Sequence, residues 1–118
     1  MSSDLQILHA GPDPAVASRL AAAISALGHK FTHRELASEA VELLGNAHFD
    51  MMLLDWEAGV DCSRLLDALH GSCPGLHIVA LVPESDAITV LSAMRGGAND
   101  CLLMDERFET ELAMCIGR

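Results

Sequence analysis

The chain has 118 residues, a length typical of one domain, and about half of them are apolar. No apolar run approaches the roughly 20 residues that a membrane-spanning helix needs, so we expect no membrane association. A formal net charge of −10 disfavours direct binding to nucleic acid, because such binding needs Lys and Arg against the phosphates.

Short apolar runs alternate with stretches of helical spacing five times along the chain. The runs predict strands over residues 5–10, 29–34, 50–54, 76–82 and 101–103. The spacing predicts helices over residues 13–27, 38–44, 62–69, 84–94 and 106–116, with a turn over 71–75. Apolar residues expected on the inner sides of the first two helices are Val16, Leu20, Ile24, Leu27, Ala40, Val41 and Leu44.

This alternation predicts an α/β fold with a five-stranded parallel sheet and helices on both faces. Five such units suit the flavodoxin-like strand order 2-1-3-4-5. We expect residues 1–118 to form a single domain, either excised from a longer signalling protein or forming its N-terminal part.

Carboxylates dominate the expected carboxyl ends of the strands, where ligands bind in this architecture. Asp55 directly follows the third strand, and Glu57 lies two residues beyond it. Asp13 follows the first strand, and we expect it to cap the first helix, with a metal-ligand role as the alternative. No glycine-rich loop leads into a helix, so a nucleotide phosphate has no recognisable cradle.

The cysteines and histidines form no recognisable metal motif. Cys62, Cys73, Cys101 and Cys115 contain no CxxC pair, and we interpret them as buried or half-buried thiols. His29 and His33 are four residues apart in an expected strand, roughly 13 Å, which argues against a shared metal.

The order and spacing of several segments resemble the response-regulator receiver family over nearly the whole chain. The matching segments are Ile7-Leu8 leading to Asp13-Pro14-Ala15, the stretch from Ser38 to Leu44, Phe49-Asp50 leading to Asp55, Pro74 to Leu81, and Met94 to Asp100. The resemblance implies a two-component phosphorelay function. It also implies that Asp55 is the position at which a histidine kinase would transfer a phosphoryl group.

The partners of this aspartate in the family are replaced here. The resemblance places the acid pair that binds Mg²⁺ at Gly11 and Pro12, the hydroxyl at Val82, and the lysine at Met104. The valine donates no hydrogen bond and the methionine carries no charge. Since phosphoryl transfer depends on positioning and charge neutralisation, efficient phosphorylation is not expected.

Two hypotheses for the function follow. The first is a pseudo-receiver that is not an enzyme, needs no cofactor and acts through protein contacts with weak or no phosphorylation. The second is a working phosphoacceptor at Asp55 with an Mg²⁺ site rebuilt from Asp13, Asp55 and Glu57. A remoter alternative is a flavodoxin-like domain that binds a small ligand.

The expected partners are a histidine kinase or a linked output domain in the cytoplasm. The fourth helix, fifth strand and fifth helix form the face that receivers use for dimers and output. On it we consider a homodimer contact made by Val90, Met94, Cys101, Phe108 and Met114, with inward-facing core residues as the alternative.

Several residues near the expected crevice can also be interpreted as purely structural. We expect Asp55 either to accept phosphate or to bond nearby backbone N–H groups. Trp56 is expected in a partly exposed loop, and His9 as a hydrogen-bonded histidine in the core or at an edge. Val82 and Met104 are expected to fill the crevice with apolar side chains.

Overall fold

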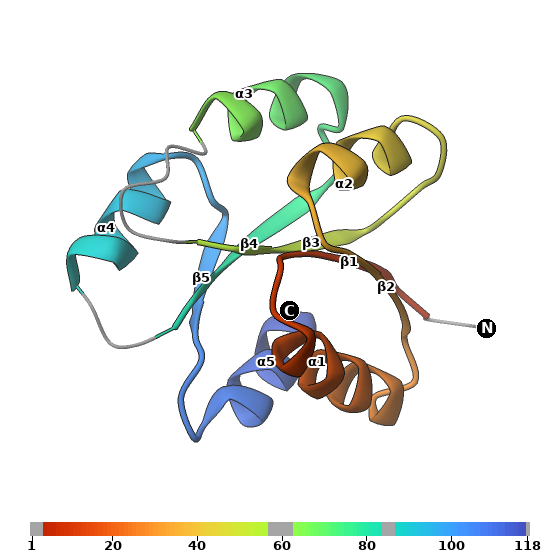
Figure 1. Cartoon of the computed structure of the whole chain (residues 1–118), viewed down its shortest axis with the longest axis vertical. Helices are drawn as coiled ribbons and strands as arrows, with labels where there is room; N and C mark the ends of the chain where they lie inside the picture. The colour runs from red at the N-terminus through yellow and green to blue at the C-terminus, as the bar shows by residue number, and fades with distance from the viewer. Residues whose placement is uncertain (1–3, 57–62, 84–86, 118) are drawn as a thin grey trace.

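The computed structural model describes residues 4–56, 63–83 and 87–117. Within them, five strands alternate with five helices (Figure 1). The strands are β1 (Gln6–Ala10), β2 (Lys30–Arg34), β3 (Met51–Asp55), β4 (His77–Val82) and β5 (Asp100–Leu103). The helices are α1 (Pro14–Ala26), α2 (Ala37–Leu44), α3 (Ser63–Ser72), α4 (Ala87–Arg95) and α5 (Phe108–Ile116).

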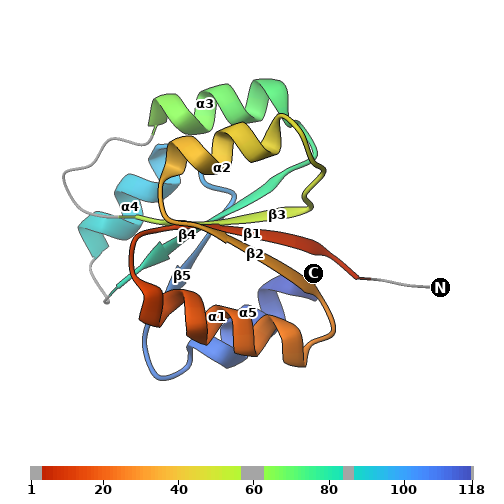
Figure 2. The ribbon, with the colours of Figure 1, turned by 45° about the vertical axis from the view of Figure 1, so that its right-hand side comes forward.

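The five strands form one parallel sheet in the order β2-β1-β3-β4-β5, which confirms the predicted topology. Helices α1 and α5 cover one face, and α2, α3 and α4 cover the other (Figure 2). Because all strands run the same way, their carboxyl ends meet at one edge of the sheet. That edge brings the ends of β1, β3 and β4 together around Asp55.

The sheet separates two apolar clusters that are mainly aliphatic, as the composition predicts. On the α1/α5 face, Leu20 and Ile24 pack with residues of the central strands and with Phe108. On the opposite face, Leu44, Leu66 and other helix residues cover the sheet. The central strands β3 and β4 contribute side chains to both clusters, as expected for strands buried on both faces.

Three local predictions about the helices are wrong. Leu27 is exposed because α1 ends at Ala26 and Gly28, with φ +84°, turns the chain just beyond it. Val41 is exposed because α2 buries Ala40 and Leu44, four residues apart on one side of a short helix. Helix α3 continues to Ser72, through a glycine that we expected in a turn.

No helix in the described part of the chain combines the length and the apolar character needed to cross a membrane.

Candidate functional site

Asp55 is the last residue of β3, at the edge where the sheet opens. Its carboxylate Oδ1 lies 2.8 Å from Nε2 of His9, a residue of β1 that is completely buried. His9 is paired with Leu53 in the register of the two strands, two residues before the aspartate. The two side chains therefore project from the same face of the sheet, because side chains alternate along a strand.

The histidine confirms one prediction and makes a contact that the sequence did not predict. His9 is buried and hydrogen-bonded, as expected for a core histidine. Its partner was not expected, since we predicted that Asp55 would bond backbone N–H groups or accept phosphate. A polar residue near the end of a central strand, adjacent to the strand that ends in Asp55, was the signal for this contact.

A second histidine extends the contact across three strands. Nδ1 of His33 in β2 lies 2.9 Å from Nδ1 of His9, and the two rings stack with centroids 4.9 Å apart. When the Nε2–H of a neutral His9 donates to Asp55, its Nδ1 accepts a hydrogen bond from the Nδ1–H of His33. Burial first, and the neighbouring His9 second, lower the pKa of His33. Both ring nitrogens of His9 are thus engaged, and the aspartate is fixed from the side of β1.

Gly11 makes room for this arrangement. A Cβ atom at this position would lie 1.9 Å from Oδ2 of Asp55 and 2.2 Å from its carboxyl carbon. The backbone of Gly11 is outside the left-handed region. A glycine is therefore needed here because a side chain would not fit, and not because of an unusual φ. The carboxylate of Asp55 therefore occupies the volume that a side chain at position 11 would need.

A cavity of about 260 Å³ lies beside Asp55 at the same edge. It is lined by Pro12, Asp13, Val16, Arg19, Asp55, Trp56, Leu81, Pro83 and Met104. Met104 borders this space as predicted, whereas Val82 is buried and does not line it. From β4, Leu81 lines this space.

Asp13 lines the same cavity as Asp55, but its carboxylate is engaged at the start of α1. Oδ1 of Asp13 accepts a hydrogen bond of 2.9 Å from the backbone N–H of Ala15, which confirms the helix-capping prediction. Glu57 lies outside the described residues. Among the residues that are described, the set of side chains close enough to share a metal ion lies elsewhere, at the other end of the sheet.

Among the described residues that line the cavity, Arg19 is the basic one. Its Nη2 lies 3.1 Å from Oε1 of Glu109, and its Cζ lies 4.8 Å from the ring centroid of Phe108. Both partners belong to α5, so the arginine joins α1 to α5 beside the cavity.

Trp56 corrects a further prediction. Only 2% of this residue is exposed, although we expected it in a partly exposed loop. Its ring packs against Gly96, where an added Cβ would lie 2.8 Å from Cη2. The indole Nε1 has no hydrogen-bond partner among the described residues. The glycine that follows α4 was the sequence signal, which we interpreted only as the end of the helix.

Solved structures of a response regulator, of a signal receiver domain and of a pilus assembly-related protein share this architecture. A response regulator from Thermotoga maritima has a TM-score of 0.84 at 14% identity, covering 98% of this chain and 99% of that chain. The signal receiver domain of a signal transduction histidine kinase from Syntrophus aciditrophicus has a TM-score of 0.81 at 23% identity, covering 97% and 88%. A putative pilus assembly-related protein from Burkholderia pseudomallei has a TM-score of 0.72 at 25% identity, covering 96% and 90%.

No protein-family model and no curated protein sequence matches the chain. The structural likenesses establish the fold, which is the five-stranded flavodoxin-like fold of CheY-like receivers.

Proposed function

We propose that this chain, which has the fold of response-regulator receiver domains, is a signalling module that acts through protein contacts and is phosphorylated weakly or not at all. The observation that supports this most directly is the 2.8 Å contact between Asp55 and the buried His9. A carboxylate fixed in this way is restrained from turning toward a phosphodonor.

The surroundings of Asp55 also provide little of what phosphoryl transfer requires. That reaction depends on cations and hydrogen-bond donors placed around the transferred group. Here Pro12 and Met104 line the adjacent cavity, and neither side chain carries a charge or a donor. Loss of a single donor of this type typically lowers a rate about 10²–10³-fold. Several such losses support a module that is not an enzyme and needs no cofactor.

One observation favours the alternative, a phosphoacceptor at Asp55. Arg19 brings a guanidinium to the same cavity, where it could neutralise part of a phosphoryl charge. In this alternative Asp13 and Glu57 would complete a magnesium site with Asp55. Asp13 would then have to bind the ion while one of its oxygens caps α1.

Reaction with a small phosphodonor distinguishes the two hypotheses. The chain would be incubated with acetyl phosphate and Mg²⁺, and the mass of the intact protein measured against an Asp55→Asn control. We expect no more phosphate on the natural chain than on the control. Stoichiometric, acid-labile phosphate that disappears in the control would contradict the proposal and support the phosphoacceptor.

Fluorescence of Trp56 provides a second test, because this residue lines the cavity beside Asp55 and is the only tryptophan in the chain. We expect titration with Mg²⁺ to leave the emission unchanged. A change that saturates in the millimolar range and is lost in Asp55→Asn would indicate a magnesium site.

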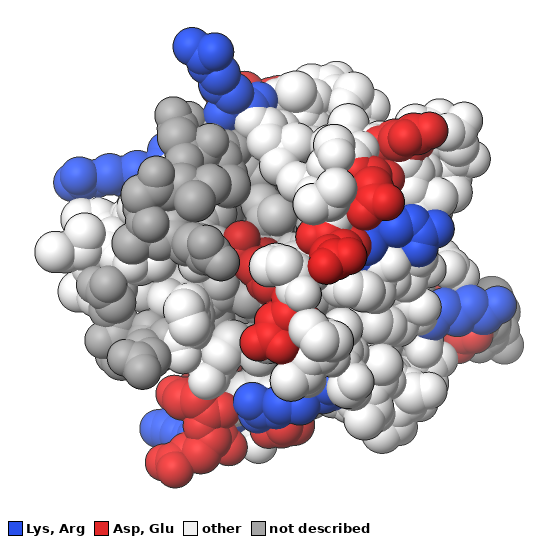
Figure 3. Space-filling view, in the orientation of Figure 1, with Lys and Arg blue, Asp and Glu red and all other residues white. Residues whose placement is uncertain are grey.

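The partners that we propose are a histidine kinase or a linked output domain in the cytoplasm. The net charge of −10 favours basic protein surfaces over nucleic acid. Acidic and basic side chains are interspersed over the face in Figure 3. We also propose a homodimer contact through α4, where Ile88, Leu91 and Met94 are exposed. Phe108, which we had considered for this surface, is fully buried.

A further inference from the structure

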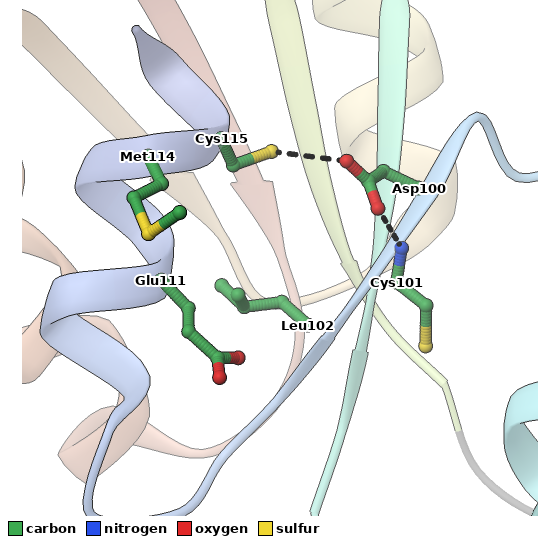
Figure 4. A pocket seen from close by; sticks show the side chains of 6 residues that line it. All are labelled: Asp100, Cys101, Leu102, Glu111, Met114 and Cys115. Carbon is green, nitrogen blue, oxygen red and sulfur yellow. Dashed lines mark hydrogen bonds between the residues drawn. The ribbon is translucent and has the colours of Figure 1, made fainter. Parts of the chain in front are cut away.

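Three side chains with metal-binding atoms meet at the end of the sheet opposite Asp55. They are His77, the first residue of β4, Asp100, the first residue of β5, and Cys115, in the last turn of α5. Their ligand atoms all lie within 4.8 Å of one another. Sγ of Cys115 lies 3.6 Å from Oδ2 of Asp100, and the two side chains point toward each other (Figure 4).

The strand register explains why these residues meet. Asp100 is paired with Val79, and His77 lies two residues before that valine in β4. The side chains of His77, Val79 and Asp100 therefore project from one face of the sheet. Val79 belongs to the apolar cluster beneath α1 and α5, and so does Cys115. The helix thus places its thiol above the amino ends of β4 and β5.

We propose that His77, Asp100 and Cys115 bind a zinc ion. Thiolate, imidazole and carboxylate are the three ligand types that zinc accepts. In a tetrahedral site with a sulfur ligand at about 2.3 Å and an oxygen ligand at about 2.0 Å, those two atoms are about 3.5 Å apart. The observed separation of 3.6 Å between Cys115 and Asp100 matches this edge of a tetrahedron.

The charge of the site also suits a divalent ion. Binding removes the proton from the Cys115 thiol and releases it to solvent. The thiolate and the carboxylate of Asp100 then contribute two negative charges, which the zinc ion neutralises, while His77 binds as a neutral imidazole. A compact site without net charge can remain partly buried at low cost, unlike an isolated charge.

A cavity of about 230 Å³ provides access and a fourth coordination position. It is lined by Asp100, Cys101, Leu102, Glu111, Met114 and Cys115. Figure 4 shows the carboxylate of Glu111 in the same cavity, away from the contact between Asp100 and Cys115. We place a water molecule at the fourth position, on the cavity side. The ion would join β4, β5 and α5, independently of whether Asp55 accepts phosphate.

Cobalt provides a spectroscopic test, because a thiolate bound to Co²⁺ gives a charge-transfer band in the near ultraviolet. The reduced, tag-free chain would be titrated with Co²⁺ and then with Zn²⁺. We expect the band to saturate at one Co²⁺ per chain and to disappear as one equivalent of Zn²⁺ displaces it. Absence of a thiolate band would overturn the proposal.

Matched variants assign the ligands. Cys115→Ser should abolish the band, whereas Cys73→Ser, at a half-buried cysteine just after α3, should retain it. His77→Gln should weaken Zn²⁺ binding at least tenfold, whereas His48→Gln, at an exposed histidine, should not. A band that survives in Cys115→Ser would overturn the site. If that variant fails to fold, unchanged affinity in His77→Gln would overturn it instead.

Discussion

The position of the Asp55 carboxylate requires a glycine at position 11. With Asp55 turned toward His9, an added Cβ at position 11 would lie 1.9 Å from its Oδ2. Position 11 therefore cannot carry a side chain unless the aspartate moves.

We expect Gly11→Ala to lower the free energy of unfolding by about 1–3 kcal/mol, the usual cost of overpacking a filled site. Gly75→Ala is the matched control, because nothing lies within 4 Å of its added Cβ, and we expect it to change stability by less than about 0.5 kcal/mol. Urea unfolding followed by tryptophan emission measures both. Equal stability of the two variants would show that the Asp55 carboxylate moves aside freely.

His33 makes stability depend on pH. Its pKa in the folded chain is lowered from the ordinary 6.5, by burial first and by His9 second. Just below pH 6.5 the unfolded chain therefore binds more protons than the folded chain does. The free energy of unfolding consequently decreases as the pH falls from 6.5 toward the pKa of His33 in the folded chain.

We expect His33→Gln to flatten this part of the curve of stability against pH. The contribution of one proton is at most about 1.4 kcal/mol per pH unit. Urea unfolding at several pH values between 5 and 7.5 measures this slope for both chains, with pH steps small enough to resolve it. Parallel curves for the variant and the natural chain would mean that His33 does not titrate in this way.

At the scale of elements, α4 differs from the other helices in what it exposes. Its buried residues are Thr89 and Ala93, which are small, while Ile88 is 80% exposed and Leu91 is 49% exposed. A helix that leaves its larger apolar side chains in water is typical of a contact surface.

We expect Leu91→Glu to weaken self-association at least tenfold, about 1.4 kcal/mol, because it places a charge in the apolar contact. Val41→Glu on α2 serves as the control, since it makes the same kind of change at another exposed apolar position. Sedimentation velocity over a range of concentrations measures the association. A natural chain that stays monomeric throughout would contradict the homodimer proposal.

At the scale of the whole molecule, the charge imbalance opposes compaction. Seventeen acidic residues face seven lysine and arginine residues, and one of these, Arg19, already pairs with Glu109. Repulsion among the remaining negative charges destabilises the compact state, and salt screens that repulsion.

We therefore expect the thermal midpoint to rise when NaCl is increased from 0.01 M to 0.15 M, over which the Debye length falls from about 30 Å to about 8 Å. A rise of a few degrees corresponds to about 1 kcal/mol for a domain of this size. Calorimetry at constant pH provides the measurement. A midpoint that falls with salt would indicate that attractive ion pairs dominate instead.

Much of the fold could be predicted because each signal is local. Strand runs, helical spacing and the glycines at helix ends depend on neighbours within a few residues. The wrong predictions concern positions at the margins of short helices, such as Leu27 and Val41, where one turn more or less decides exposure. Trp56 was misplaced because its burial depends on Gly96, forty residues away.

The sequence by itself determined the alternating α/β fold and the position of Asp55 at the end of β3. Only the tertiary structure decided that this aspartate is bound to His9, 46 residues away, and that His77, Asp100 and Cys115 meet at the opposite end of the sheet. The reason is that strand order and register set these distances, whereas a sequence pattern records only which face each residue occupies.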